Sequence, residues 1–131
     1  MTPEGRSYLA KAQEDLNDAR KIADIGLAKV AARSAYYAAF HAAEALIFER
    51  TGKIAKTHTG VRSEFSRPMK ETPNFDRSLT AFLAKAYTFK EIGDYGIGPA
   101  AIITMEEAEE ALAAARQFVE KVTAMLAGAH N

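Results

Sequence analysis

A cation, a phenol, an imidazole and a carboxylate recur at helical spacing in one part of the sequence, as Arg33, Tyr37, His41 and Glu44. At about 100° per residue in an α-helix, these side chains fall within an arc of roughly 80°. Arginine can hold a phosphate and histidine can transfer a proton, so this polar seam could bind an anion or carry acid–base chemistry. The alternative is a hydrogen-bonded seam between helices, in which Glu44 pairs with an arginine or a histidine.

A second candidate site is a basic group around His58, which is expected in the first turn of a short helix. Arg62 follows one turn later in the segment KTHTGVRSEFSR. Helix N-termini attract anions, and added basic side chains strengthen that attraction. We therefore take His58, Arg62 and Lys90 as candidate anion-binding residues. An ordinary solvated start of a helix is the alternative.

A third group, Lys90, Asp94 and Tyr95, lies in the segment KEIGDYGIG. The glycines predict a loop that contains Asp94 and Tyr95, although they match no phosphate-binding loop. Lys90 lies about 20° from Leu79 around the preceding helix, so its stem is on the apolar side. A lysine there either extends outward to solvent or pairs with an acid such as Asp94.

Composition limits the kinds of protein this chain can be. It has 131 residues, of which 48% are hydrophobic, so we expect one folded domain over residues 1–131. Its seventeen basic and seventeen acidic residues cancel, so any contact with RNA must come from a local patch. Cysteine is absent, which excludes disulfides, thiolate catalysis and cysteine-ligated zinc.

We expect neither a metal site, a cofactor nor a membrane segment. The histidines His41, His58 and His130 are far apart, and no His-x-x-x-His pair occurs. No segment approaches the roughly 18 uninterrupted apolar residues of a membrane helix, and the N-terminus lacks the apolar stretch of a signal peptide. A cytoplasmic protein is the expectation.

Apolar residues repeat with the 3.6-residue period of helices, and no segment alternates with a period of two over a useful length. The fold class predicted is all-α, a bundle of about five helices with the alanine-rich second helix at its centre. The predicted helices are Pro3 to about Ile25, about Ala28 to Arg50, His58 to about Arg67, one capped by Asn74 or Asp76 that continues through Phe89, and one beginning at a Thr104–Glu107 capping box.

The runs RSAYYAAFHAAEALI, HTGVRSEF, DYG and EEAEEALAAARQFVEKV, in this order and spacing, resemble the short bacterial branch of the HEPN family. The similarity extends from about Leu16 to Leu126. The resemblance implies a HEPN-like helical bundle that often dimerises and is commonly encoded beside a minimal nucleotidyltransferase. Some such pairs act as toxin and antitoxin. In active members the toxin is a metal-independent ribonuclease whose motif is an arginine followed, four to six residues on, by a histidine.

This chain departs from that motif. Seven residues separate Arg33 from His41, and Lys90 stands where this branch usually has an arginine, which keeps the charge but loses the bidentate fork. We therefore assign no catalytic residue. The leading hypothesis is that the chain is a non-enzymatic or weakly active partner of a minimal nucleotidyltransferase. In this hypothesis the chain itself binds nucleotide or RNA. The alternatives are a metal-independent endoribonuclease toxin with a divergent site, and a helical interaction module without a ligand.

The second helix has more small and aromatic positions than a bundle of this size needs for its own core. We therefore predict a symmetric homodimer. In it, Arg33 and His41 would lie close to the partner subunit or to a shared cleft.

Overall fold

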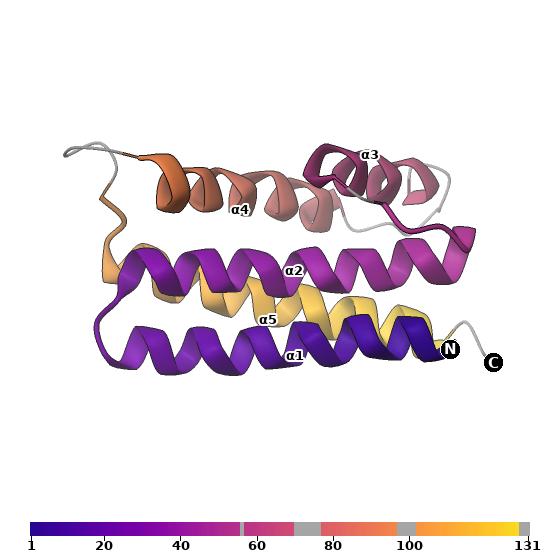
Figure 1. Ribbon diagram of the computed structural model, residues 1–131, viewed down its shortest axis with the longest axis horizontal. Helices are drawn as coiled ribbons and strands as arrows, with labels where there is room; N and C mark the ends of the chain where they lie inside the picture. The colour runs from indigo at the N-terminus through magenta and orange to yellow at the C-terminus, as the bar shows by residue number, and fades with distance from the viewer. Residues whose placement is uncertain (56, 70–76, 97–101, 129–131) are drawn as a thin grey trace.

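The computed structural model describes residues 1–55, 57–69, 77–96 and 102–128, which form five α-helices and no β-strand. The helices are α1 (Pro3–Asp24), α2 (Ala28–Thr51), α3 (His58–Met69), α4 (Arg77–Tyr95) and α5 (Met105–Gly128). In Figure 1, α2 runs through the middle of the bundle, with α1 and α5 on one side and α3 and α4 on the other. The predicted all-α bundle is confirmed, and α2 is its central helix, packed against each of the other four.

Helix α1 starts and stops at residues that favour helix ends. The Thr2 hydroxyl accepts a hydrogen bond from the Gly5 N–H at 3.0 Å, and Pro3 occupies the first turn, where no intrahelical bond is lost. Gly26 adopts φ +88° after the last turn, which glycine tolerates because it has no Cβ. Glu49 accepts a hydrogen bond from the Thr2 N–H at 2.7 Å, so the start of α1 is tied to the end of α2.

Helix α2 is buried along most of its length because its small side chains let neighbouring helices come close. Eight of its alanines are at most 1% exposed: Ala31, Ala32, Ala35, Ala38, Ala39, Ala42, Ala43 and Ala45. The other helices of the same chain therefore bury these alanines, and no partner subunit is needed to cover them. The small residues no longer argue for a homodimer, which stays a prediction.

Helix α4 extends further than the sequence indicated. Asp94 and Tyr95, predicted to lie in a loop, form its last turn, and Gly96 N–H donates to the Ile92 carbonyl at 2.9 Å. Lys90 and Asp94 form an ion pair at 2.9 Å one helical turn apart, which offsets part of the roughly 1 kcal/mol that the glycine between them costs. The loop prediction is wrong for residues 92–95. The remainder of that segment, residues 97–98, and the predicted caps at positions 74 and 76 lie outside the described residues.

Helix α5 begins with the predicted capping box. Thr104 N–H donates to Glu107 Oε1 at 3.0 Å, and Glu107 N–H donates to Thr104 Oγ1 at 3.1 Å. The guanidinium of Arg20 donates through two nitrogens to the Glu109 carboxylate, with Nη1 2.7 Å from Oε2, and this bidentate pair joins α1 to α5. Phe118 packs its ring 5.4 Å from that of Phe65, so α5 also meets α3 in the core.

Among the described helices, none has both the length and the apolar character needed to cross a lipid bilayer.

Candidate functional site

The four residues of the polar seam lie in a row along α2, and each contacts the next. The Arg33 guanidinium carbon is 5.7 Å from the centroid of the Tyr37 ring, and that ring stacks on the His41 ring with centroids 6.2 Å apart. His41 Nδ1 is 2.8 Å from Glu44 Oε1. The phenol ring therefore separates the cation from the imidazole, so the seam is a row and not a convergent site.

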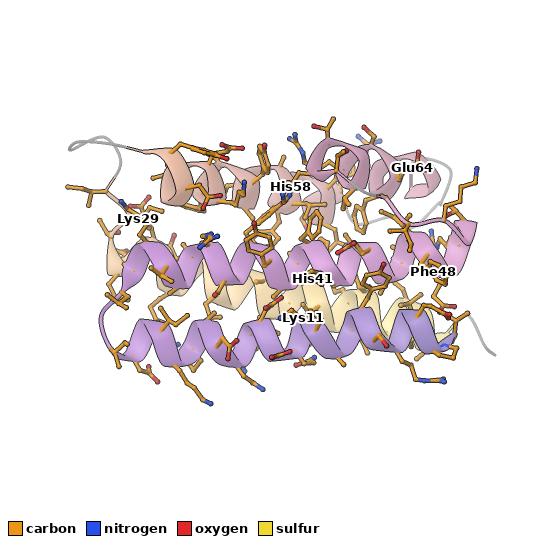
Figure 2. The ribbon with its side chains drawn as sticks, viewed as in Figure 1. Lys11, Lys29, His41, Phe48, His58 and Glu64 are labelled. Atoms are coloured by element: carbon orange, nitrogen blue, oxygen red, sulfur yellow. The ribbon has the colours of Figure 1, made fainter. Side chains whose placement is uncertain are left out.

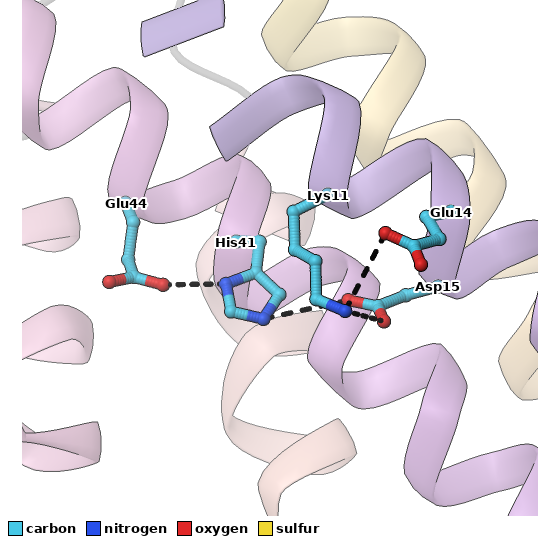
Figure 3. Close-up of polar contacts among 5 residues, drawn as sticks. All are labelled: Lys11, Glu14, Asp15, His41 and Glu44. Carbon is cyan, nitrogen blue, oxygen red and sulfur yellow. Dashed lines mark hydrogen bonds and ion pairs between the residues drawn. The ribbon is translucent and has the colours of Figure 1, made fainter. Parts of the chain in front are cut away.

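His41 lies at the interface between α1 and α2, where it faces two carboxylates (Figure 3). Its Nδ1 contacts Glu44 on its own helix, and its Nε2 lies 3.5 Å from Asp15 Oδ2 on α1. The Nζ of Lys11 lies 3.7 Å from Asp15 Oδ1 and 3.7 Å from a Glu14 oxygen. We call these five residues the α1–α2 cluster. The predicted pairing of Glu44 with a histidine is present within α2, and the contact of His41 with Asp15 links the seam to α1.

Asp15 belongs to this site but was not singled out from the sequence, although a signal for it existed. It lies three residues after Ala12 and four before Ala19, which places a carboxylate on the apolar face of α1. The residue is only 8% exposed, and this burial raises the pKa of its carboxyl group, while His41 and Lys11 act to lower it. An acid within a buried stripe is a marker of a partnered or functional group.

A second cluster joins α2 to the end of α4. Arg33 Nε is 2.9 Å from Asp94 Oδ1, and Lys90 Nζ is 2.9 Å from Asp94 Oδ2. The predicted pairing of Lys90 with Asp94 is therefore present, and Arg33 completes it from another helix. Hydrogen bonding to Asp94 raises the pKa of Lys90, while the bond from Lys90 and the charge of Arg33 lower the pKa of Asp94. Two basic side chains thus share one carboxylate.

Tyr95 lies at the outer edge of this second cluster. Its residue is 71% exposed, and Lys90 Nζ lies 5.6 Å from the ring centroid. The Arg33 side chain is 47% exposed, whereas Lys90 is 7% exposed as a residue. An exposed aromatic ring therefore adjoins the buried cation Lys90, and the more accessible cation Arg33 is paired with the neighbouring Asp94. We call Arg33, Lys90, Asp94 and Tyr95 the α2–α4 cluster.

His58, at the start of α3, points toward α2 and is enclosed by aromatic rings (Figure 2). Its Nδ1 is 2.6 Å from the Tyr36 hydroxyl, and Phe40 lies 4.7 Å away between ring centroids. Burial, and after it the charge of Lys90, lowers the pKa of the imidazole. Burial raises the pKa of Tyr36, so both partners in this hydrogen bond are neutral at pH 7. His58 thus acts first as a packing residue that fixes α3 on α2.

The candidate anion-binding residues His58, Arg62 and Lys90 all contact Tyr87 of α4. The Arg62 guanidinium carbon lies 4.4 Å from the Tyr87 ring centroid, Lys90 Nζ lies 5.9 Å away, and the His58 ring centroid lies 5.6 Å away. The structure therefore brings these residues together, but around an aromatic ring. Sequence reasoning missed Tyr36 and Tyr87, since their spacing is that of ordinary core residues.

Within the described residues, no three or more histidine, cysteine, aspartate or glutamate side chains are grouped so that they could hold a metal ion. His130, the third histidine of the sequence, lies outside those residues.

Comparison with known proteins gives a consistent result. Residues 6–125 match the HEPN domain. The chain is 28% identical over 127 residues to the UPF0332 protein glr0978 of Gloeobacter violaceus, a match that covers 97% of this chain and 99% of that protein. It is 34% identical over 89 residues to a UPF0332 protein of Archaeoglobus fulgidus, covering 68% of this chain and 70% of the relative. A UPF0332 protein of Thermotoga maritima is 29% identical over 86 residues, or 66% of this chain and 64% of that protein.

Proposed function

Because the chain belongs to the HEPN domain family, we propose that it is the partner of a minimal nucleotidyltransferase in a toxin–antitoxin-like pair. In this proposal it binds nucleotide or RNA and cleaves RNA weakly or not at all by itself. The nucleotidyltransferase partnership and a homodimeric state rest on the family resemblance. The binding activity and the lack of cleavage rest on the two clusters along α2.

The observation that carries the proposal is the position of Tyr37 between Arg33 and His41, in contact with both. A metal-independent ribonuclease needs a cation and a proton-transferring group at one phosphate. Eight residues along a helix place these two side chains about 12 Å apart along its axis. His41 is also held between Glu44 and Asp15, and Arg33 is held by Asp94. Both groups therefore have structural partners, which supports weak cleavage or none.

The α2–α4 cluster supports binding of a nucleotide or a single RNA strand. Exposed aromatic rings stack on nucleobases, and a guanidinium can contact a phosphate through nitrogens not used elsewhere. Arg33 uses Nε for Asp94 and has its side chain half exposed, while the exposed Tyr95 adjoins Lys90. Arg33 and Lys90 place two cations beside the single carboxylate of Asp94 at this end of α2. We therefore place the ligand at this end of α2.

A cleavage assay tests the first half of the proposal. Purified protein is incubated with structured RNA in EDTA, alongside His41→Ala and His58→Ala variants. We expect no cleavage above the level of the variants. Robust cleavage that disappears in either variant would favour the endoribonuclease toxin over the proposal. Cleavage that persists equally in both variants indicates contamination, and a second purification step then has to remove it.

A binding assay tests the second half. Anisotropy of a labelled single-stranded RNA and competition by ATP are measured for the wild type, Arg33→Ala and Tyr95→Ala. The matched control is Arg116→Ala, which removes the same charge from an exposed position on α5. Each variant of the α2–α4 cluster should weaken binding by about threefold to tenfold or more, as loss of a stacked base or a phosphate contact does. If Arg33→Ala and Arg116→Ala bound the RNA with equal affinity, binding at the α2–α4 cluster would be contradicted.

A third assay separates the partnership from a plain interaction module. The protein is purified from its native host, and the proteins and nucleic acids that accompany it are identified. A nucleotidyltransferase in the eluate supports the proposal. Elution with other proteins only, without nucleotide or RNA, would favour the interaction module.

A further inference from the structure

The α1–α2 cluster contains an imidazole whose two nitrogens each face a carboxylate oxygen. His41 Nδ1 is 2.8 Å from Glu44 Oε1, and Nε2 is 3.5 Å from Asp15 Oδ2 (Figure 3). The carboxylates are well shielded, since the Glu44 and Asp15 side chains are 11% and 12% exposed. A neutral imidazole carries one N–H, so it can donate to only one of the two oxygens.

The shorter contact requires the imidazole proton on Nδ1, because an ionised Glu44 can only accept a hydrogen bond. Nε2 then presents a lone pair to Asp15 Oδ2, and two acceptors face each other. Among the described residues, Asp15 Oδ2 is a buried oxygen without a hydrogen-bond donor. Such an oxygen destabilises the fold, and one added proton would convert this contact into a hydrogen bond.

We propose that Asp15, His41 and Glu44 form a proton-dependent clasp between α1 and α2. The clasp binds one proton in the gap between Asp15 Oδ2 and His41 Nε2 and then holds the two helices together more tightly. A proton from solvent forms an N–H bond at Nε2, that N–H donates to Asp15 Oδ2, and no other covalent bond changes. The assignment does not depend on nucleotide or RNA binding.

The charges around the clasp determine whether it takes up the proton between Asp15 and His41. The titratable groups near the clasp on α1 are Lys11, Glu14, Asp18 and Tyr8. Tyr36 and Tyr37 lie near it on α2, and His58 on α3 interacts with the charge of Glu44. Lys11 opposes proton uptake, but its Nζ is 3.7 Å from both Asp15 and Glu14 and is shared between them. The carboxylates of the clasp and its neighbours outnumber the nearby cations. Burial also raises the pKa of Asp15, which acts in the same direction.

The test is urea unfolding at about pH 8 and about pH 6, which bracket the range in which an imidazole titrates. The wild type is compared with Asp15→Asn, whose amide can donate to Nε2 in place of the added proton. The matched control is Asp18→Asn, the same change at an exposed position one turn along α1, which removes a charge near the clasp but no contact within it. Comparing variants removes the contribution of His58, which favours unfolding on acidification and is common to all of them.

We expect the folding equilibrium constant at pH 6, divided by that at pH 8, to be several-fold larger for the wild type and Asp18→Asn than for Asp15→Asn. We also expect Asp15→Asn to have the higher urea midpoint at pH 8. Glu44→Gln should behave like Asp15→Asn, since its amide donates to Nδ1 and leaves the imidazole proton for Asp15. Identical ratios for Asp15→Asn and Asp18→Asn, or a lower midpoint for Asp15→Asn at pH 8, would overturn the proposal.

Discussion

The side of α2 that faces α1 and α5 is made mostly of alanines that are at most 1% exposed, whereas the side that faces α3 and α4 carries aromatic rings around His58. The first side lets helix backbones approach closely. The second fills the wider space with Tyr36, Phe40 and Tyr87, and brings basic side chains of α3 and α4 against ring faces. One helix thus combines a rigid packing surface with a chemically varied one, and both polar clusters lie along the border between the two.

The largest effect should come from enlarging the alanine side. Ala38 is fully buried and lies about 200° around the helix from Tyr36, so it faces α1 and α5. We expect Ala38→Leu to lower the free energy of unfolding by about 2–3 kcal/mol, because the close-packed helices cannot accommodate the added carbons. Denaturant unfolding measures the change. Ala10→Leu, at an exposed position on α1, should change it by less than about 0.5 kcal/mol. An effect of Ala38→Leu no larger than that of Ala10→Leu would mean that the alanine side of α2 is not closely packed.

A smaller effect should come from removing one oxygen on the aromatic side. We expect Tyr36→Phe to lower the free energy of unfolding by about 1–2 kcal/mol, because His58 Nδ1 loses its partner in a buried place. Urea unfolding at neutral pH checks this value. Tyr95→Phe is the control, since that ring is 71% exposed, and it should be near neutral. A neutral Tyr36→Phe would show that packing alone holds α3 on α2.

The smallest effect concerns the border between the sides, at Asp94. Its pKa is lowered by the hydrogen bond from Lys90 and by the charge of Arg33. Its stabilising contribution is therefore fully present above the ordinary aspartate pKa and is lost as the pH falls through the lowered pKa of Asp94. Asp94→Asn should therefore lower the free energy of unfolding at pH 7 by less than about 1 kcal/mol, given the partly exposed pair. The difference between the variant and the wild type should shrink as the pH falls below about 4, and it should disappear only below the lowered pKa of Asp94. A constant difference between them at both pH values would contradict this account.

Local patterns predicted the helices well because each helix carries its own signals. Thr2 and Pro3 start α1, the Thr104–Glu107 pair starts α5, and both are seen in the structure. The end of α4 was missed for a local reason as well. Glycine-rich sequence indicated a loop, and the Lys90–Asp94 pair and the hydrogen bond from Gly96 to Ile92 keep the chain helical through Tyr95.

The candidate site was harder to predict because its partners come from other helices. Spacing placed Arg33, Tyr37 and His41 in one row, and the contacts between them agree with that expectation. Spacing on α2 contains no information about which acid of α1 or α4 approaches. Asp15 and Asp94 reach His41 and Arg33 only through the packing of whole helices.

The burial of Tyr36 gives the molecule a built-in optical reporter. The sequence has five tyrosines and no tryptophan, so tyrosine absorbance carries the near-ultraviolet signal that tryptophan would otherwise dominate. Phenolate absorbs at longer wavelength than phenol, and burial raises the pKa of Tyr36 well above its ordinary value. In an alkaline titration, this ring should ionise only as α2 separates from α3 and α4. A step in phenolate absorbance at high pH that is absent from Tyr36→Phe would therefore report the separation of α2 from α3 and α4 without an added label.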